Sequence, residues 1–167
     1  MFLETVSFSH GSILDVSSVA RECKVERKTV EGYLSILEDL LLSFKVPVFT
    51  RKAKRRLSAH PKFYLFDTGV FTALRPRGPL DDVSEIHGPA LEGLIAQHFR
   101  TWCGYREEIC GLYSWRTRSG KDYPQAGALL IYRGRERLVQ KGILCISYDA
   151  FLKALTPGRS IKEAAGA

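Results

Sequence analysis

The segment from residue 27 to residue 41 constrains the fold more than any other part of the sequence. Its apolar residues recur at steps of three and four, which places side chains on one helix face; they are Val30, Tyr33, Leu34, Leu37, Leu40 and Leu41. A shorter helical segment around residues 19–23 precedes it, across the turn Lys24-Val25-Glu26. Ser17 and Ser18 are candidate N-caps for this first helix. Two short helices joined by a three-residue turn predict a helix-turn-helix.

Two strands are expected after the helices. Phe44, Val46 and Val48 alternate with other residues, which indicates a strand over residues 42–49. Residues 62–66 form the second strand, and Asp67 begins a turn or caps a helix. Two helices followed by a hairpin is the plan of a winged helix. We therefore expect residues 1–75 to form a winged helix, with residues 50–61 as its wing.

The positive charge of the chain is concentrated in this predicted hairpin. Residues 45–62 contain seven basic residues and no acidic residue. The whole chain has 25 basic and 18 acidic residues, so the remainder holds 18 of each and is neutral. A focused basic patch attracts polyanions, most simply nucleic acid. A charge run is also often a solvated loop without a ligand, and both interpretations stay open.

The residues expected to contact double-stranded DNA come from the predicted turn, the second helix and the wing. In helix-turn-helix proteins the N-terminal end of the second helix enters the major groove, and basic residues of a wing contact phosphates. The candidate nucleic-acid-binding residues are Lys24, Arg27, Lys28, Thr29, Arg51, Lys52, Lys54, Arg55 and Arg56. Helix-turn-helix units also serve as packing or protein-docking modules, which is the alternative for this surface.

The composition changes at residues 76–79, Pro-Arg-Gly-Pro, which predicts a domain boundary. Beyond it we expect a helix that starts near Pro89, because proline suits the first helical turn. Further strands are predicted at residues 112–116, 127–132 and 143–146, with a last helix at 148–155. Residues 84–155 would form a second mixed domain and residues 156–167 a frayed tail. The predicted fold class is therefore α/β (α+β).

Three stretches resemble the C-terminal half of a large group of bacterial and archaeal AAA-type ATPases, a half described as a domain of unknown function. The stretches are residues 19–39, residues 61–70, and Gly88-Pro89-Ala90-Leu91-Glu92 together with Tyr113-Ser114-Trp115-Arg116-Thr117-Arg118-Ser119-Gly120. They cover most of residues 13–120. The resemblance implies an ATPase module, then a winged helix, then a domain similar to restriction endonucleases.

The sequence departs from that plan in two places. It contains no Gly-x-x-x-x-Gly-Lys-Ser/Thr loop to cradle phosphates, so we expect no ATPase module. In the family, a strand with a Glu-Val-Asp-like triplet follows Trp-Arg-Thr-x-Ser-Gly. Here Gly120 leads through Lys121 and Asp122 into a segment that resembles the family's later strand. We interpret residues 120–123 as the scar of an internal deletion, which leaves a reduced nuclease-like remnant.

No catalytic residue, metal or cofactor is expected. Glu92 corresponds to the helix acid of a nuclease-like site, but the neighbours of Asp122 do not match the family triplet, and a magnesium site needs convergent carboxylates. None of the histidines is expected to be a ligand: His10, His60 and His87 stand apart from cysteines and carboxylates at ligand spacing, and His98 is expected at the edge of the core.

We expect a cytoplasmic protein that does not enter a membrane. No uncharged run exceeds ten residues, far fewer than the roughly 20 that span a bilayer. The four cysteines form no Cys-x-x-Cys pair, so neither a zinc site nor a redox pair is indicated, and scattered thiols are typical of a reducing compartment. The predicted function is a non-enzymatic DNA-binding or docking module. The alternatives are a fragment that associates with a full-length ATPase paralogue, in an oligomeric state left open, and a decayed remnant without a selected function.

Overall fold

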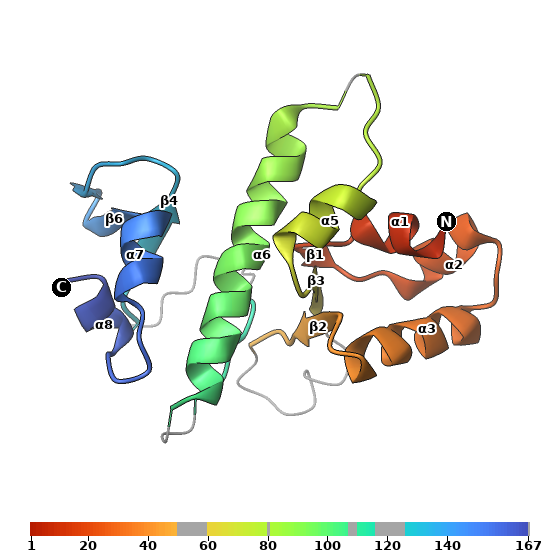
Figure 1. Ribbon diagram of the computed structural model, residues 1–167, viewed down its shortest axis with the longest axis horizontal. Helices are drawn as coiled ribbons and strands as arrows, with labels where there is room; N and C mark the ends of the chain where they lie inside the picture. The colour runs from red at the N-terminus through yellow and green to blue at the C-terminus, as the bar shows by residue number, and fades with distance from the viewer. Residues whose placement is uncertain (50–59, 80, 107–109, 116–125, 167) are drawn as a thin grey trace. The chain divides into compact units, whose positions relative to one another are not determined.

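The computed structural model describes residues 1–49, 60–79, 81–106, 110–115 and 126–166 as helices, two three-stranded sheets and their connections (Figure 1). This mixed α/β content agrees with the predicted class. The chain divides into two compact units. The first comprises Met1–Gln97 with Leu112–Arg116, and the second comprises His98–Gly111 with Thr117–Ala167. The division therefore differs from the boundary predicted at residues 76–79.

The first unit begins with three helices and a short strand. They are α1 (Phe2–Ser7), β1 (Ser12–Ile13), α2 (Val16–Cys23) and α3 (Arg27–Asp39). The two predicted helices are confirmed as α2 and α3, whereas the sequence pattern predicts neither α1 nor β1. The prediction that Ser17 or Ser18 caps α2 is wrong. The Asp15 side chain accepts hydrogen bonds from both of their backbone N–H groups, at 3.0 and 3.1 Å, and is the N-cap.

Strand β3 (Lys62–Leu65) lies at the centre of the first sheet, in the order β1-β3-β2. Strand β2 (Ser43–Val46) pairs with it antiparallel, with Phe44 opposite Tyr64. Helix α5 (Thr68–Leu74) follows, capped by Asp67, whose carboxylate accepts from the Val70 N–H at 2.8 Å.

Residues 112–115 contribute one bridge where the sequence predicts a strand over 112–116. Ser114 exchanges backbone hydrogen bonds with Pro47 and Phe49, each at 2.8 Å. This bridge extends the pairing beyond the end of β2. Arg116, the last residue of the predicted strand, lies outside the described residues.

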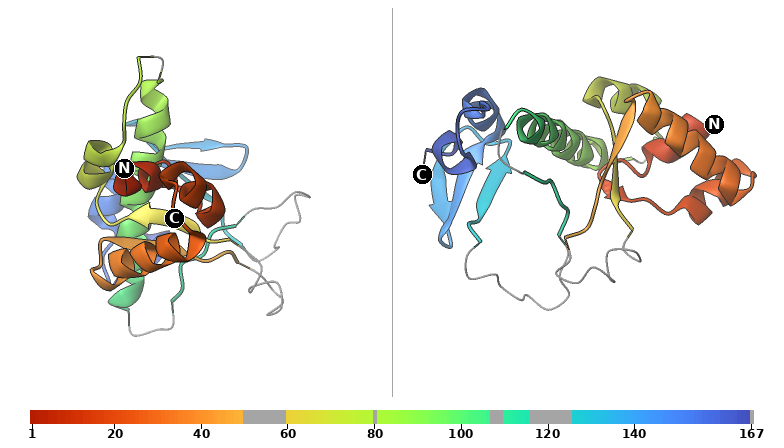
Figure 2. Two further views of the ribbon diagram at one scale, coloured as in Figure 1. Left: turned by 90° about the vertical axis from the view of Figure 1, so that its right-hand side faces the viewer. Right: turned by 90° about the horizontal axis from the view of Figure 1, so that it is seen from below.

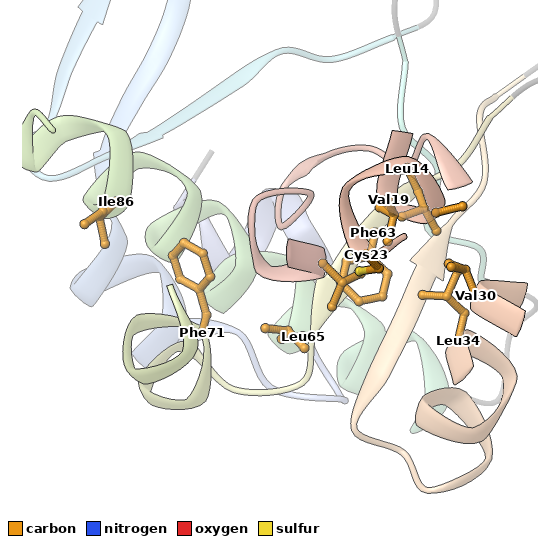
Figure 3. Packing of buried hydrophobic residues seen from close by; sticks show 11 residues of the cluster. Leu14, Val19, Cys23, Val30, Leu34, Phe63, Leu65, Phe71 and Ile86 are labelled. Atoms are coloured by element: carbon orange, nitrogen blue, oxygen red, sulfur yellow. The ribbon is translucent and has the colours of Figure 1, made fainter. Parts of the chain in front are cut away.

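The core of the first unit forms between the helices and β3 (Figure 3). Phe63 of β3 is fully buried, and the side chains packed with it come from α2, α3, α5 and the start of α6: Val19, Cys23, Val30, Leu34, Phe71 and Ile86. Five elements thus contribute to one continuous apolar cluster.

Of the six residues predicted to form the buried apolar face of α3, three are buried and three are exposed. Val30, Leu34 and Leu37 are buried, but Tyr33 and Leu40 are 43% and 61% exposed. The core contacts a narrow arc of the helix, whereas the six predicted residues extend over much more of its circumference. Leu41, also predicted to be buried, follows the helix with φ 59° and is exposed.

The second unit contains the other sheet. Strands β4 (Leu129–Tyr132) and β6 (Ile143–Ser147) pair in parallel, and β5 (Leu138–Gln140) joins the other edge of β6 antiparallel. Lys141 and Gly142 connect β5 to β6 with φ of 52° and 77°, the positive values of a tight hairpin turn. The strands predicted at 127–132 and 143–146 are confirmed with small shifts at their ends.

The predicted fraying of residues 156–167 is wrong for residues 160–165. After α7 (Tyr148–Ala154), the chain forms α8 (Ile161–Ala164), which starts with a capping box between Ser160 and Glu163. Ala164 and Ala165 are buried in a cluster with Phe151, which is itself fully buried. The tail is therefore held by both a helix cap and apolar packing.

Helix α6 (Val83–Gly104) starts before the predicted position, and Pro89 lies inside it instead of in its first turn. The Asp82 carboxylate accepts from the Ser84 N–H at 2.8 Å and satisfies one donor of the first turn. Near the other end of α6, Cys103 forms a disulfide with Cys110, which the cysteine spacing does not indicate. His98, expected at the edge of the core, is exposed.

Replacing Leu37 with alanine tests the register of α3. Leu37 is 8% exposed, so we expect the free energy of unfolding to fall by about 2–5 kcal/mol, the usual cost for a buried leucine. Ser35 is exposed on the same helix and provides the control, because Ser35→Ala should change stability by no more than about 0.5 kcal/mol. Urea denaturation followed by circular dichroism measures both variants. Equal, small effects would contradict this register.

Candidate functional site

The described part of the predicted nucleic-acid surface lies where α2 passes into α3. Lys24 adopts a left-handed conformation with φ 55° and ends α2, with its N–H bonded to the Arg21 carbonyl at 3.2 Å. Lys24, Arg27 and Lys28 are exposed, and Thr29 is half-buried. The turn therefore presents three basic side chains close together in the sequence at the start of α3.

Acidic residues reduce the positive charge of this surface. The Arg27 Nε atom lies 2.8 Å from Glu31 Oε1, one helical turn further along. Helix α3 also carries Glu38 and Asp39 at its C-terminal end. Arg27 and Lys28 lie at the end of α3 where the helix dipole disfavours cations. The start of α3 can contact phosphates, but its charge is modest compared with that of residues 45–62.

The five predicted wing residues, Arg51, Lys52, Lys54, Arg55 and Arg56, lie outside the described residues. The two lysines at the ends of the basic segment are described, and both form ion pairs. Lys45 Nζ lies 2.8 Å from Glu38 Oε1, and Lys62 Nζ lies 2.6 Å from Glu92 Oε1. Because the protein itself engages these two charges, five of the seven basic residues of the segment, those at 51–56, remain as candidates for contact with a ligand.

Glu92, the candidate helix acid of a nuclease-like site, connects α6 to β3. Its Oε1 atom accepts hydrogen bonds from Lys62 Nζ and from the Tyr64 hydroxyl, each at 2.6 Å. Burial and the neighbouring Glu92 carboxylate raise the pKa of Tyr64, so this hydroxyl stays protonated and donates. The other candidate acid, Asp122, lies outside the described residues. Within the described ranges, no three His, Cys, Asp or Glu side chains gather as they would around a metal ion.

His10 lies beside this group and is 2% exposed. Its ring stacks on Phe71 at 4.1 Å between centroids and meets Tyr64 edge-on at 5.6 Å. The Nδ1 atom accepts a hydrogen bond from the Leu65 N–H at 3.1 Å. The ring approaches α6 so closely that a Cβ at position 93 would overlap it, which explains why glycine occupies that position.

The surroundings of His10 fix its protonation state. Because Nδ1 accepts, the proton of the neutral ring is on Nε2. Burial lowers the pKa of His10 to about 4, against smaller opposing effects of the Pro89 carbonyl and the Glu92 carboxylate. Among the described residues, Nε2 has no hydrogen-bond partner of ordinary geometry. His10 is thus a neutral, buried group at physiological pH.

The group formed by His10, Lys62, Tyr64 and Glu92 joins β3 to residues that are distant in the sequence. The ion pair spans 30 residues, and the His10–Leu65 hydrogen bond spans 55. No local motif contains these residues, and the sequence pattern gives no sign of them beyond the glycine at position 93. The geometry assigns them a structural role, because they hold α6 and the segment before β1 against β3.

Lowering the pH should destabilise the first unit through His10. The pKa of His10 is about 4 in the folded protein against an ordinary value of 6.5, so the unfolded chain takes up a proton first. Stability is then complete above pH 6.5 and falls as the pH approaches 4, by a total of about 3 kcal/mol.

Denaturation of the native protein and of His10→Phe between pH 7 and pH 4 measures this effect. The phenylalanine variant retains an aromatic ring and cannot titrate, so its stability should depend less on pH, whatever its absolute stability. Parallel curves for the two proteins would show that His10 does not contribute to the pH dependence.

A comparison with protein families finds a match over part of the chain. Within the described residues, no helix has the length and apolarity needed to cross a bilayer. No curated protein and no solved structure matches the chain. Residues 1–81, which cover α1 to α5, match the model of a family described as a domain of unknown function, DUF8612.

Proposed function

We propose that residues 1–75 form a winged helix that binds double-stranded DNA through its phosphates. The element order α1-β1-α2-α3-β2-β3, with β3 between β1 and β2 in the sheet, supports this topology. The observation that carries the proposal is the charge distribution. All of the excess positive charge falls between Lys45 and Lys62, and the register pairs Val46 with Lys62 at the base of this segment. Phosphate contacts require such a concentration of cations.

The proposed binding does not depend on DNA sequence. Lys24, Arg27 and Lys28 would supply additional phosphate contacts at the start of α3. Further along the helix, the exposed side chains include Glu31, Ile36 and Asp39, which are poorly suited to the base edges and phosphates of a major groove. Phosphate contacts position a protein on a duplex without reading its sequence, so binding should be similar for duplexes of different sequence.

Salt titration of DNA binding tests the wing. For each phosphate that the protein neutralises, the logarithm of the affinity should fall by roughly 0.9 per logarithmic unit of salt. The double variant Arg55→Ala/Arg56→Ala should weaken binding and flatten this dependence. The matched control is Lys141→Ala/Lys162→Ala, which removes the same charge from exposed positions of the second unit. Fluorescence anisotropy with a mixed-sequence duplex measures all three proteins, and an equal loss in both variants would remove the proposal.

A protein-docking role is the second candidate, and one observation favours it. Helix α3 exposes Tyr33, Ile36 and Leu40, with 43, 53 and 61% of each residue accessible. Exposed apolar side chains that adjoin on one helix are typical of a protein interface. A full-length AAA-type ATPase paralogue, the partner that the sequence resemblance suggests, is one candidate. Lys45, paired with Glu38, lies near the C-terminal end of this surface.

We further propose that the protein is not an enzyme, and a plasmid-nicking assay tests this. The Glu92 carboxylate is already engaged by Lys62 and Tyr64, and a single carboxylate binds magnesium weakly. Purified protein with magnesium or manganese should leave supercoiled plasmid intact. Glu92→Ala is the necessary comparison, because nicking that disappears in this variant would establish a metal-dependent nuclease.

A further inference from the structure

Helix α3 is apolar on two opposite faces. Val30, Leu34 and Leu37 point into the core of the first unit. At 100° per residue, Gly32 and Ile36 lie roughly 160° around the helix from Leu34, on the exposed side. Leu40 follows Ile36 in the same row, at a spacing of four residues. In the right-hand view of Figure 2, α3 lies beside α2 at the edge of this unit, and Ile36 and Leu40 are exposed.

A glycine lies in the middle of this exposed face. Gly32 has no positive φ, and, apart from its neighbours and the backbone of its own helix, no described atom lies within 4 Å of the position that its Cβ would occupy. Neither backbone conformation nor packing inside the unit therefore requires glycine here, although glycine weakens a helix relative to alanine. Close approach of a second helix at this point would require it, because interhelical distance depends on the side chains at the contact.

The charges at the two ends of this face are complementary. Lys28 and Asp39 are eleven positions apart, which is about three helical turns, so they lie on the same side as Gly32. Both are exposed, and within the described part of the chain neither forms an ion pair. The face is therefore basic at its N-terminal end, apolar in the middle and acidic at its C-terminal end.

We propose that α3 pairs antiparallel with α3 of a second copy of this chain, around a two-fold axis near Gly32 and Tyr33. In this arrangement Lys28 of each copy faces Asp39 of the other, Ile36 of both copies lies near the axis, and Leu40 of each copy lies beyond Asp39, beside the start of the partner helix. A two-fold interface uses the same patch on both subunits and must be self-complementary, which this face is. The pairing rests on the docking role of α3 and is independent of phosphate contacts by residues 51–56.

The oligomeric state of the full chain provides the first test. Sedimentation equilibrium should give a mass that rises with concentration from 18.8 kDa to twice that value. Ile36→Glu should raise the dissociation constant at least tenfold, because it places two carboxylates in an apolar contact. Val139→Glu, at a 69% exposed position of the second unit, is the matched control and should leave the mass unchanged. A monomer at all concentrations, or equal effects of both variants, would overturn the proposal.

A charge exchange tests the antiparallel arrangement. Lys28→Glu and Asp39→Lys should each weaken the dimer at least threefold, because each places like charges opposite one another in both halves of the interface. The double variant restores opposite charges and should recover the native dissociation constant at low salt. Additive losses in the double variant would exclude this arrangement.

Gly32→Ala separates an interface role from a role within one subunit. Alanine favours the helix, so dilute, monomeric protein should melt at a higher temperature. The added methyl group should at the same time raise the dissociation constant of the dimer. A higher melting temperature with unchanged association would contradict the close approach at Gly32. The variant Arg55→Ala/Arg56→Ala should alter DNA binding and leave association intact, so failure of the winged-helix proposal and failure of this pairing give different results.

Discussion

The first unit depends on the position of β3 at the centre of its sheet. This strand pairs with β1 on one side and β2 on the other, and its Phe63 side chain is fully buried. On its other face, Tyr64 and Lys62 both bind the Glu92 carboxylate of α6. A change that displaces β3 would therefore disturb the apolar core and the polar contacts to α6 together. The two faces of β3 are closed differently: apolar packing alone covers the Phe63 face, whereas the Tyr64 face combines an apolar cluster with hydrogen bonds to Glu92.

Local patterns predict the elements of this chain better than they predict the partners of each side chain. The helical spacing identifies α3 and the burial of Leu34, because three-and-four spacing follows directly from helix geometry. The same spacing assigns Leu40 to the core, although the core contacts only one arc of the helix. The His10 contacts could not be predicted, because its hydrogen-bond partner is 55 residues away. Local sequence rules can identify a helix-capping residue such as Asp15. Here Ser17 and Ser18 satisfy the same rule equally well, so the sequence does not distinguish between them.

Ion pairs divide the basic residues of the hairpin into two groups. Lys45 and Lys62 are partly shielded from solvent and bind acids on α3 and α6, so they contribute to the structure around β2 and β3. The five basic residues between them lie outside the described part of the chain. The net charge does not reveal this difference, because a lysine that pairs with a carboxylate of its own chain adds as much to the sum as any other lysine. The proposed DNA contacts therefore concern fewer cations than the composition suggests.

The pairing of Val46 with Lys62 has a consequence for how this protein can change during evolution. The sheet holds both ends of the segment between these two residues. A change in the length of the segment therefore need not shift the register of β2 against β3. The entropy of closing a loop grows slowly, by about 0.6 kcal/mol for each doubling of its length. Insertions and new cations between these two residues would then cost little stability. The charge of this segment can therefore change while the sheet beneath it keeps the same register.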